Sequence, residues 1–272
     1  MTLLASWIGV DTHGPTSAYI VSDSRISWGT RSVFDYGKKV FASSQYPEIF
    51  GYAGDVLFPS IVLGQIVEMI NCNLLFGKEA SCKEKNEAIY HQLCYALSKY
   101  PDELEDRPIQ ILHITRDTEF EKYPNFHQYL MAWSKKDGWH RCEVLIPDKS
   151  EILHVLGSGR SEFIANYERY QQGINQSTSR NVFHCFLDTL NNIKDPFCGG
   201  APQLVGIYRK PLTCGNNYGI IYCKKRYFLG MSVPGDSEFN NIEWRNELFE
   251  LVDGKTKKRI DGAAKQPDPL RR

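Results

Sequence analysis

The first ten residues, MTLLASWIGV (Met1–Val10), are apolar, include β-forming residues and lack a helical spacing, so they predict a β-strand. The second residue of this stretch is Thr2. Because a small second residue permits removal of Met1, Thr2 is a candidate N-terminal residue. An N-terminal threonine carries a hydroxyl and a free α-amine, and therefore supplies a nucleophile and its base together. The stretch offers Thr2 as a candidate nucleophile at the start of a strand.

The composition is that of an ordinary globular protein, with 272 residues, a formal net charge of zero, 42% hydrophobic residues and 24% charged residues. We expect neither nucleic acid nor a membrane as a partner. There is no basic excess, and no apolar run approaches the ~20 residues of a membrane span. The first ten residues also lack the basic start of a secretory signal. These features predict a cytoplasmic protein.

The cysteines and histidines give no metal-binding pattern. The 8 cysteines are scattered without a C-x-x-C pair, and several lie in apolar runs, which suits buried free thiols in a reducing compartment. The histidines show neither H-x-x-H nor H-E-x-x-H spacing. Cys72, Cys82 and Cys94 are interpreted as helix-packing residues. We therefore expect no metal and no cofactor.

The order of predicted elements separates strands from helices. Ser81 and Glu84 have the spacing of a capping box at the start of the second helix. Residues 26–35 are expected to form a loop, and the tail from residue 254 is expected to be loose. Strands are expected at 1–10, 17–22, 36–42, 48–53, 109–114, 127–133, 139–146, 152–156, 203–209, 218–223 and 226–232. Helices are expected at 56–75, 81–99, 161–171, 180–193 and 243–252.

This order of strands, two helices, strands, two helices and strands predicts the α+β class. Segregated runs favour two antiparallel sheets stacked face to face with helices outside, which is a four-layer αββα sandwich. No linker or internal repeat interrupts the pattern.

Polar residues end or interrupt three of the apolar strands. They are Asp23, Lys39 and the Gly54-Asp55 turn. A lysine at a core-facing position of a strand must find an anionic partner or lose its charge. Asp23 is a candidate for that partner.

Several segments together resemble the active-site segments of proteasome β-subunits and of the related bacterial proteasome-like peptidase, which are N-terminal-nucleophile hydrolases. The resemblance covers roughly residues 2–232, and these residues are predicted to form one such domain. Residues 233–272 are predicted to be a C-terminal extension that is partly disordered. The segments are Thr2-Leu3-Leu4, Val21-Ser22-Asp23-Ser24-Arg25, Lys38-Lys39-Val40, Tyr52-Ala53-Gly54, Leu156-Gly157-Ser158-Gly159 and Asp195-Pro196-Phe197-Cys198-Gly199-Gly200.

The resemblance implies a role for each catalytic residue. Thr2 would attack a carbonyl, Lys39 would stabilise the developing alkoxide, and Asp23 would orient Lys39. The backbone N–H of Gly54 would donate to the oxyanion. The support around the α-amine would come from Ser158, Asp195 and Cys198.

The resemblance also implies a substrate site. Ser27 would lie on a strand that pairs with an extended substrate backbone. The first specificity pocket would be shaped by Ile26, Phe41, Tyr52 and Val56, and the bulky Tyr52 predicts a shallow pocket.

The sequence departs from the family pattern at three places. Cys198 stands where a serine is usual and is a poorer hydrogen-bond partner. Asp55 brings a carboxylate next to the expected oxyanion site. The segment from Thr2 to Asp23 is also longer than in the family by about five residues, which we assign to the hairpin turn.

The predicted function is that of a proteasome-like threonine peptidase acting on peptides or unfolded protein. Family members assemble into rings, often with an ATPase, so the resemblance implies a homo-oligomeric ring and a possible ATPase or other regulatory partner. One alternative is a small-molecule amidase on the same fold. The other is a non-catalytic scaffold subunit, against which the presence of Asp23, Lys39 and Gly54 argues.

Overall fold

The first strand lies inside a sheet and is buried on both faces. β1 (Leu4–Asp11) pairs antiparallel with β2 (Gly14–Ser22) on one side and with β10 (Glu151–Leu156) on the other. On one face of the sheet, Trp7 packs in an apolar cluster that includes side chains from helices. On the opposite face, Ile8 packs in a separate apolar cluster. Because successive side chains of a strand point to opposite faces, burial of both faces accounts for the continuous apolar run.

The structure is a computed structural model that describes residues 2–29, 32–101, 107–117, 123–210, 214–239 and 241–265. The further strands of the sheet around β1 are β11 (Gln203–Tyr208), β12 (Asn216–Tyr222), β13 (Lys225–Phe228), β14 (Met231–Ser232), β15 (Trp244–Arg245) and β16 (Leu251–Val252). The strand order is β10-β1-β2-β11-β12-β13-β14, and β15 pairs with β12 and β16. The β12–β15 pair is parallel, whereas the other pairs described for this sheet are antiparallel.

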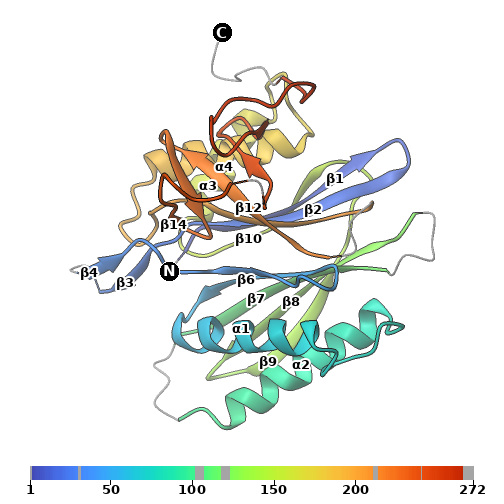
Figure 1. Cartoon of the computed structure of the whole chain (residues 1–272). Coiled ribbons are helices and arrows are strands. Elements are labelled where there is room, and N and C mark those ends of the chain that lie inside the picture. Colours follow the sequence, from blue (N-terminus) through green and yellow to red (C-terminus); the bar gives the residue numbers. More distant parts are fainter. Residues whose placement is uncertain are drawn as a thin grey trace.

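A second, smaller sheet lies against this larger sheet (Figure 1). Its strands, in spatial order, are β5 (Val40–Ala42), β6 (Glu48–Gly54), β7 (Ile109–Arg116), β8 (Phe126–Ser134) and β9 (Gly138–Val144), each antiparallel to its neighbours.

The two sheets approach closely at a glycine. A Cβ atom on Gly51 of β6 would lie 2.7 Å from Ile20 Cγ2 and 2.8 Å from Leu4 Cδ1, both on the larger sheet. Apolar side chains from both sheets fill the space around this contact. The absence of a side chain at residue 51 therefore lets the two sheets pack at this point.

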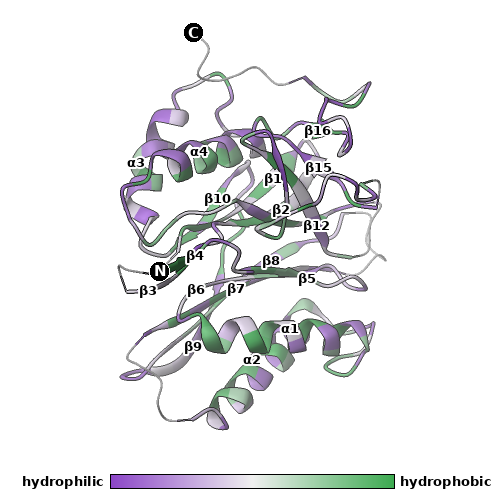
Figure 2. Ribbon diagram, turned by 60° about the vertical axis from the view of Figure 1, so that its left-hand side comes forward, coloured by the Kyte–Doolittle hydropathy of each residue, from purple (hydrophilic) through white to green (hydrophobic). Residues whose placement is uncertain are grey.

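The helices lie on the outer faces of the sheets. In Figure 1, α1 and α2 lie beneath the smaller sheet, and α3 and α4 lie on the far side of the larger one. Figure 2 shows hydrophobic residues on the strands and on the helix faces turned toward them. The bounds are α1 (Leu57–Asn71), α2 (Cys82–Ser98), α3 (Arg160–Tyr170) and α4 (Ser179–Asn192).

The antiparallel sheets and the helix positions agree with the predicted α+β class. The capping box at the start of α2 is confirmed, because Ser81 accepts from the Glu84 N–H while the Glu84 carboxylate accepts from the Ser81 N–H. None of the described helices combines the length and the apolar character that a membrane-spanning helix requires.

The expected helix at 243–252 is wrong. This segment instead forms β15 and β16, and Trp244 packs against Gly219 of β12, where a Cβ would lie 2.4 Å from the indole. Trp244 and Val252 share a small apolar cluster. Burial of the indole against the sheet outweighs the weak helical spacing of the segment. The part of the predicted C-terminal extension that contains β15 thus joins the larger sheet.

Two shorter predictions also need correction. Residues 26–35 do not form a plain loop, because β3 (Ile26–Trp28) and β4 (Ser32–Phe34) pair as a hairpin. The strand expected at 36–42 contains only Val40–Ala42. Lys39 precedes it, because its backbone N–H donates to the side chain of Gln203 instead of to a neighbouring strand (N···Oε1 2.9 Å).

A fully buried cluster of ionisable groups joins α2 to the smaller sheet. Glu48 Oε2 lies 2.6 Å from His113 Nε2, and Glu48 Oε1 accepts from the Thr115 hydroxyl at 2.8 Å. Lys85 of α2 places its Nζ 3.2 Å from Glu48 Oε1, as an ion pair rather than a well-aligned hydrogen bond. Removing one member of such a cluster leaves the others buried without compensation.

We expect Lys85→Ala to lower the free energy of unfolding by about 3–5 kcal/mol, because Glu48 loses a buried cation. The matched control is Lys83→Ala in the same turn of α2, where the side chain is exposed. This control should change stability by no more than about 0.5 kcal/mol. Urea unfolding of both variants measures the difference, and equal stability of the two would contradict the prediction.

Candidate active site

A buried lysine joins Thr2 to Asp23. Lys39 Nζ donates to Thr2 Oγ1 at 2.9 Å and to Asp23 Oδ1 at 2.8 Å. All three residues are fully buried. Three positions separated by up to 37 residues thus meet at one ammonium group. A cation held against a hydroxyl lowers the cost of forming an alkoxide there.

Asp23 is held by backbone donors as well as by the lysine. Its Oδ1 also accepts from the N–H of Leu3 (3.1 Å). Its Oδ2 accepts from the N–H of Arg25 (3.2 Å) and of Gly199 (3.0 Å). Both oxygens therefore have two donors, and the carboxylate cannot turn away from the ammonium without breaking hydrogen bonds.

Gln203, at the start of β11, fixes the backbone on either side of the site. Its Oε1 accepts from the Lys39 N–H at 2.9 Å, and its Nε2 donates to the carbonyls of Asp23 (3.0 Å) and Gly37 (2.7 Å). The side chain is fully buried. Sequence reasoning missed this residue, because a glutamine at the start of a strand gives no signal of which loops it will join.

The loop between β10 and α3 presses on the backbone of Thr2. The Gly159 N–H donates to the Thr2 carbonyl at 3.3 Å. Gly157 has φ +91°, and a Cβ there would lie 1.9 Å from the same carbonyl oxygen. Only glycine fits both the positive φ and this close approach. The Gly-Ser-Gly turn therefore lies directly beside the candidate nucleophile.

Ser158, Cys198 and Asp195 form a chain next to this turn. Ser158 Oγ lies 3.7 Å from Cys198 Sγ, which in turn lies 3.5 Å from Asp195 Oδ2. Burial is the main cause that raises the pKa of the Cys198 thiol to about 12. The thiol is therefore neutral at ordinary pH and acts as a weak hydrogen-bonding link between the serine and the aspartate.

Arg25 and Asp35 form a clamp outside the buried centre. Arg25 donates through Nε and Nη2 to the two oxygens of Asp35, at 2.7 and 2.9 Å. Its Nη1 donates to the carbonyls of Pro196 and Cys198 at 3.1 and 3.3 Å. The clamp ties the loop that holds Gly199 to the chain that follows Asp23. The sequence placed Arg25 in the segment Val21-Ser22-Asp23-Ser24-Arg25 but gave neither Arg25 nor Asp35 a role.

The residues predicted for the first specificity pocket lie on β3, β5 and β6 and just before α1. Phe41, Tyr52 and Val56 belong to the apolar cluster packed against α1. Tyr52 is fully buried, and its hydroxyl donates to the Lys38 carbonyl at 3.1 Å. The Ile26 side chain contacts Gly37, where a Cβ would lie 2.4 Å from Ile26 Cδ1.

Ser27 and the Gly54-Asp55 turn contact backbone segments outside the Lys39 cluster. Ser27 of β3 pairs with Val33 of β4. Gly54 ends β6 with φ +96°, and a Cβ there would lie 1.9 Å from the Pro108 carbonyl oxygen. The Asp55 carboxylate accepts from the Phe58 N–H at 3.1 Å in the first turn of α1. The carboxylate that the sequence placed beside the oxyanion site thus serves the start of a helix.

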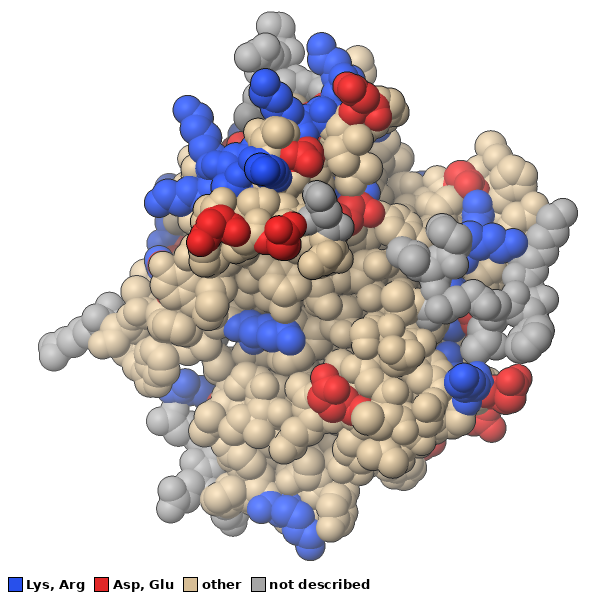
Figure 3. All heavy atoms as spheres, viewed as in Figure 1, with Lys and Arg blue, Asp and Glu red and all other residues tan. Residues whose placement is uncertain are grey.

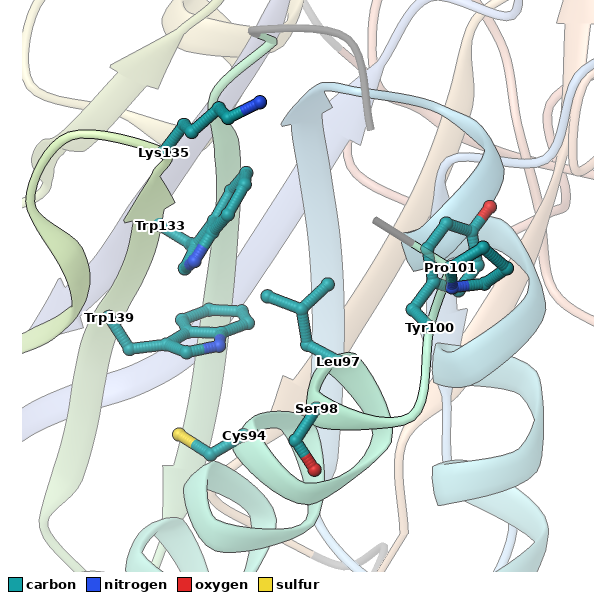
Figure 4. A pocket seen from close by; sticks show the side chains of 8 residues that line it. All are labelled: Cys94, Leu97, Ser98, Tyr100, Pro101, Trp133, Lys135 and Trp139. Carbon is teal, nitrogen blue, oxygen red and sulfur yellow. The ribbon is translucent and has the colours of Figure 1, made fainter. Parts of the chain in front are cut away.

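Two hollows differ in their relation to this site. One of about 600 Å³ along α3 includes Gly157 and Ser158, so it reaches the turn beside Thr2. The other, of about 270 Å³, contains none of the predicted site residues. Figure 4 shows it lined by Trp133 and Trp139 of the smaller sheet and by Leu97 near the end of α2.

On the face of the molecule seen in Figure 3, acidic and basic side chains are interspersed.

Comparisons with known proteins show a likeness of fold. No family profile matches the chain, and a search of curated proteins found no significant match. The chain is similar to the Anbu Gly-1 mutant from Hyphomicrobium sp. strain MC1, with 11% identity, a TM-score of 0.51 and coverage of 80% of this chain and 87% of that one. It is similar to Anbu in a helical assembly from Pseudomonas aeruginosa, with 10% identity, a TM-score of 0.54 and coverage of 79% and 85%. It is also similar to Anbu from Yersinia bercovieri, described as an ancestral β-subunit. The identity is 9%, the TM-score is 0.52, and the match covers 85% of this chain and 88% of that one.

We expect the Arg25–Asp35 clamp to make stability depend on pH in the acid range. The hydrogen bonds from Arg25 are the main cause that lowers the pKa of Asp35. A lowered pKa adds stability above the unfolded-state pKa of about 3.9, and this stability is lost as the pH falls through the lower folded-state value. The stability advantage of the wild type over Asp35→Asn should therefore be larger at pH 7 than at pH 3.

Chemical unfolding at both pH values measures this difference. Asp148→Asn, at an exposed aspartate before β10, is the control and should follow the wild type at both values. An advantage over Asp35→Asn that is unchanged at pH 3 would show that the clamp contributes no pH dependence.

Proposed function

We propose that the chain is a proteasome-like N-terminal-nucleophile hydrolase with a four-layer αββα sandwich and with Thr2 as its nucleophile after removal of Met1. Met1 lies outside the described residues. One observation carries the proposal, namely the buried Lys39 ammonium that bonds the Thr2 hydroxyl and the Asp23 carboxylate together. A lysine kept in the interior at a cost in desolvation, and bonded to a hydroxyl, is typical of a catalytic centre.

The reaction begins with attack of Thr2 Oγ on the carbonyl carbon of an amide. The hydroxyl proton passes to the α-amine of Thr2, directly or through a water, and then to the nitrogen of the leaving amine as the C–N bond breaks. The product is an ester between Thr2 and the acyl group. Water then adds to this ester, releases the acid and returns the proton to Thr2.

The neighbouring residues stabilise charge at each stage. The Lys39 ammonium favours the alkoxide character of Thr2, and Asp23 holds Lys39 in place. The Gly54 N–H donates to the oxyanion, and the loss of one such donor typically costs roughly 10²–10³ in rate. Ser158, Cys198 and Asp195 make the hydrogen-bonded support of the α-amine. The contacts of Gly157 and Gly159 with Thr2 support this arrangement.

The proposed substrate is a peptide or a segment of unfolded protein in extended form. Ser27 belongs to the strand along which it pairs. The burial of Tyr52 and its bond to the Lys38 carbonyl support a shallow first pocket, since they hold this bulky ring in place next to the Lys38 backbone. Ile26, Phe41 and Val56 complete the pocket. The hollow along α3 that includes Gly157 and Ser158 offers room next to the turn beside Thr2.

The proposal includes a cytoplasmic homo-oligomeric ring and an ATPase or other regulatory partner. Similarity in fold to Anbu, which forms a helical assembly in Pseudomonas aeruginosa, supports an oligomer. A small-molecule amidase on the same fold uses the same Thr2 chemistry. A non-catalytic scaffold has no need for a buried ammonium against a hydroxyl. Light scattering distinguishes the ring-forming peptidase from the amidase, because a monomer favours the amidase.

We expect the active protein to lack Met1 and to form a covalent adduct with an electrophile directed at N-terminal threonine. Intact-mass spectrometry measures both, before and after the reaction. Thr2→Ala should lower hydrolysis of casein or short fluorogenic peptides by roughly 10³-fold or more, because no other hydroxyl replaces the nucleophile.

Thr2→Ser is the matched control, since it keeps a hydroxyl and permits removal of Met1. It should retain measurable activity and form the adduct. Retention of Met1 in the active preparation, or full activity of Thr2→Ala, would remove Thr2 from the mechanism.

We expect Lys39→Ala to reduce hydrolysis by roughly 10²–10⁴-fold, because the ammonium beside Thr2 is lost. Lys136→Ala is the matched control. Its side chain is exposed in the turn between β8 and β9, so activity should remain near that of the wild type.

Circular dichroism on both variants ensures that folded protein is compared, since Lys39→Ala leaves Asp23 without its cation. Equal activity of the two folded variants would exclude Lys39 from the reaction.

A further inference from the structure

Three side chains that can bind a metal meet at the start of α2, on the helix-covered side of the smaller sheet. Cys82 is the first residue of α2, Asp117 follows β7, and His127 lies on β8. One ligand atom from each residue lies within 4.8 Å of the other two. Cys82 Sγ is 3.3 Å from Asp117 Oδ1, and His127 Nε2 is 3.8 Å from the same oxygen.

Each of the two surface ligands is oriented by an outer partner. Asp117 Oδ2 accepts from the backbone N–H and the side-chain amide of Asn125, at 3.2 and 3.1 Å, so Oδ1 is turned toward the cysteine. His127 Nδ1 bonds to Glu143 Oε1 at 2.8 Å, which leaves Nε2 directed toward Asp117. A carboxylate on the second nitrogen of a histidine is the usual outer contact of a metal-binding imidazole.

The cysteine is held on the buried side. Thr115 Oγ1 lies 3.7 Å from Cys82 Sγ, and Thr115 is also the direct neighbour of His127 across the β7–β8 pair. Cys82 is 3% exposed. The side chains of His127 and Asp117 are 30% and 28% exposed. The group is therefore closed toward the core and open toward solvent.

The donor set selects the metal. One sulfur, one imidazole nitrogen and one carboxylate oxygen suit Zn²⁺, with bonds of about 2.3 Å to sulfur and about 2.0–2.2 Å to nitrogen and oxygen. In a tetrahedral site such atoms lie about 3.4–3.7 Å apart. The observed 3.3 and 3.8 Å fall within a few tenths of an ångström of these values.

We propose that Cys82, Asp117 and His127 bind one Zn²⁺ ion per chain, with water as the fourth ligand. Binding forms a zinc–thiolate bond and releases the thiol proton of Cys82 to solvent. The ion ties the first turn of α2 to the ends of β7 and β8. The site shares no residue with the Thr2 centre. Its ligands are 35 and 10 residues apart in the sequence, so it has none of the short spacings by which zinc sites are recognised.

Metal binding by the full-length protein tests the proposal. After treatment with a chelating resin, the protein is loaded with Zn²⁺ or Co²⁺ and desalted. We expect one Zn²⁺ per chain by elemental analysis, a thiolate-to-cobalt charge-transfer band in the near ultraviolet, and a higher Tm with Zn²⁺. Cys82→Ser should abolish the charge-transfer band.

Cys142→Ser is the matched control, because Cys142 is an exposed thiol on the adjacent β9 and is not part of the group. It should bind Zn²⁺ and give the cobalt band as the wild type does. Asp117→Asn and His127→Gln keep the size of the ligands and should weaken Zn²⁺ binding at least tenfold. They decide the outcome if Cys82→Ser fails to fold.

The absence of retained Zn²⁺ in the wild type would overturn the proposal. So would a charge-transfer band that persists in Cys82→Ser, or unchanged Zn²⁺ affinity in both Asp117→Asn and His127→Gln. These readouts do not involve hydrolysis, so their outcome is independent of the function proposed for Thr2.

Discussion

The contact of Lys39 with Thr2 and Asp23 is the interaction on which the arrangement of the N-terminal region depends. An ammonium group in the protein interior is stable only if an anion and further polar groups replace its water. Asp23 supplies the anion, and its own two oxygens require four donors in all. Three of these donors are backbone N–H groups from separate segments, and one of them comes from Gly199, which is 176 residues away. The need to compensate one buried charge thus draws together the first strand, the end of β2, and the loop before β11.

Glycine and side-chain amide groups make this convergence possible. Gly157 touches the Thr2 carbonyl at a distance that no other residue could reach with a positive φ. Gln203 bonds to the backbone at both Asp23 and Lys39, so the two ends of the ion pair are held by one buried side chain. A site built in this way is preorganised, because its groups have few alternative positions once the sheets have packed.

A second polar centre lies on the other side of the smaller sheet. There Glu48, Lys85 and His113 compensate one another beneath α2, and the group of Cys82, Asp117 and His127 lies at the start of the same helix. Thr115 joins the two, since its hydroxyl donates to Glu48 and lies near Cys82 Sγ. The helix is therefore held by charges and polar bonds at its first turn and by apolar packing along the rest of its length.

Local chemistry in the sequence was sufficient for most elements and for part of the site. Apolar stretches of β-forming residues without helical spacing predicted the strands, the capping box of Ser81 and Glu84 predicted the start of α2, and a lysine beside an apolar strand predicted a buried partner for Lys39. The sequence could not predict the Gln203 bridge, the Arg25–Asp35 clamp, the parallel pairing of Trp244 or the meeting of Cys82 with His127. Each of these joins residues whose local patterns are unremarkable and whose distance in space is set by how the sheets and helices pack. Hydrophobic period and turn chemistry act over a few residues, so the sequence by itself determined which segments form strands and helices. The compensation of buried charges acts between segments, so only the tertiary structure decided which polar groups meet.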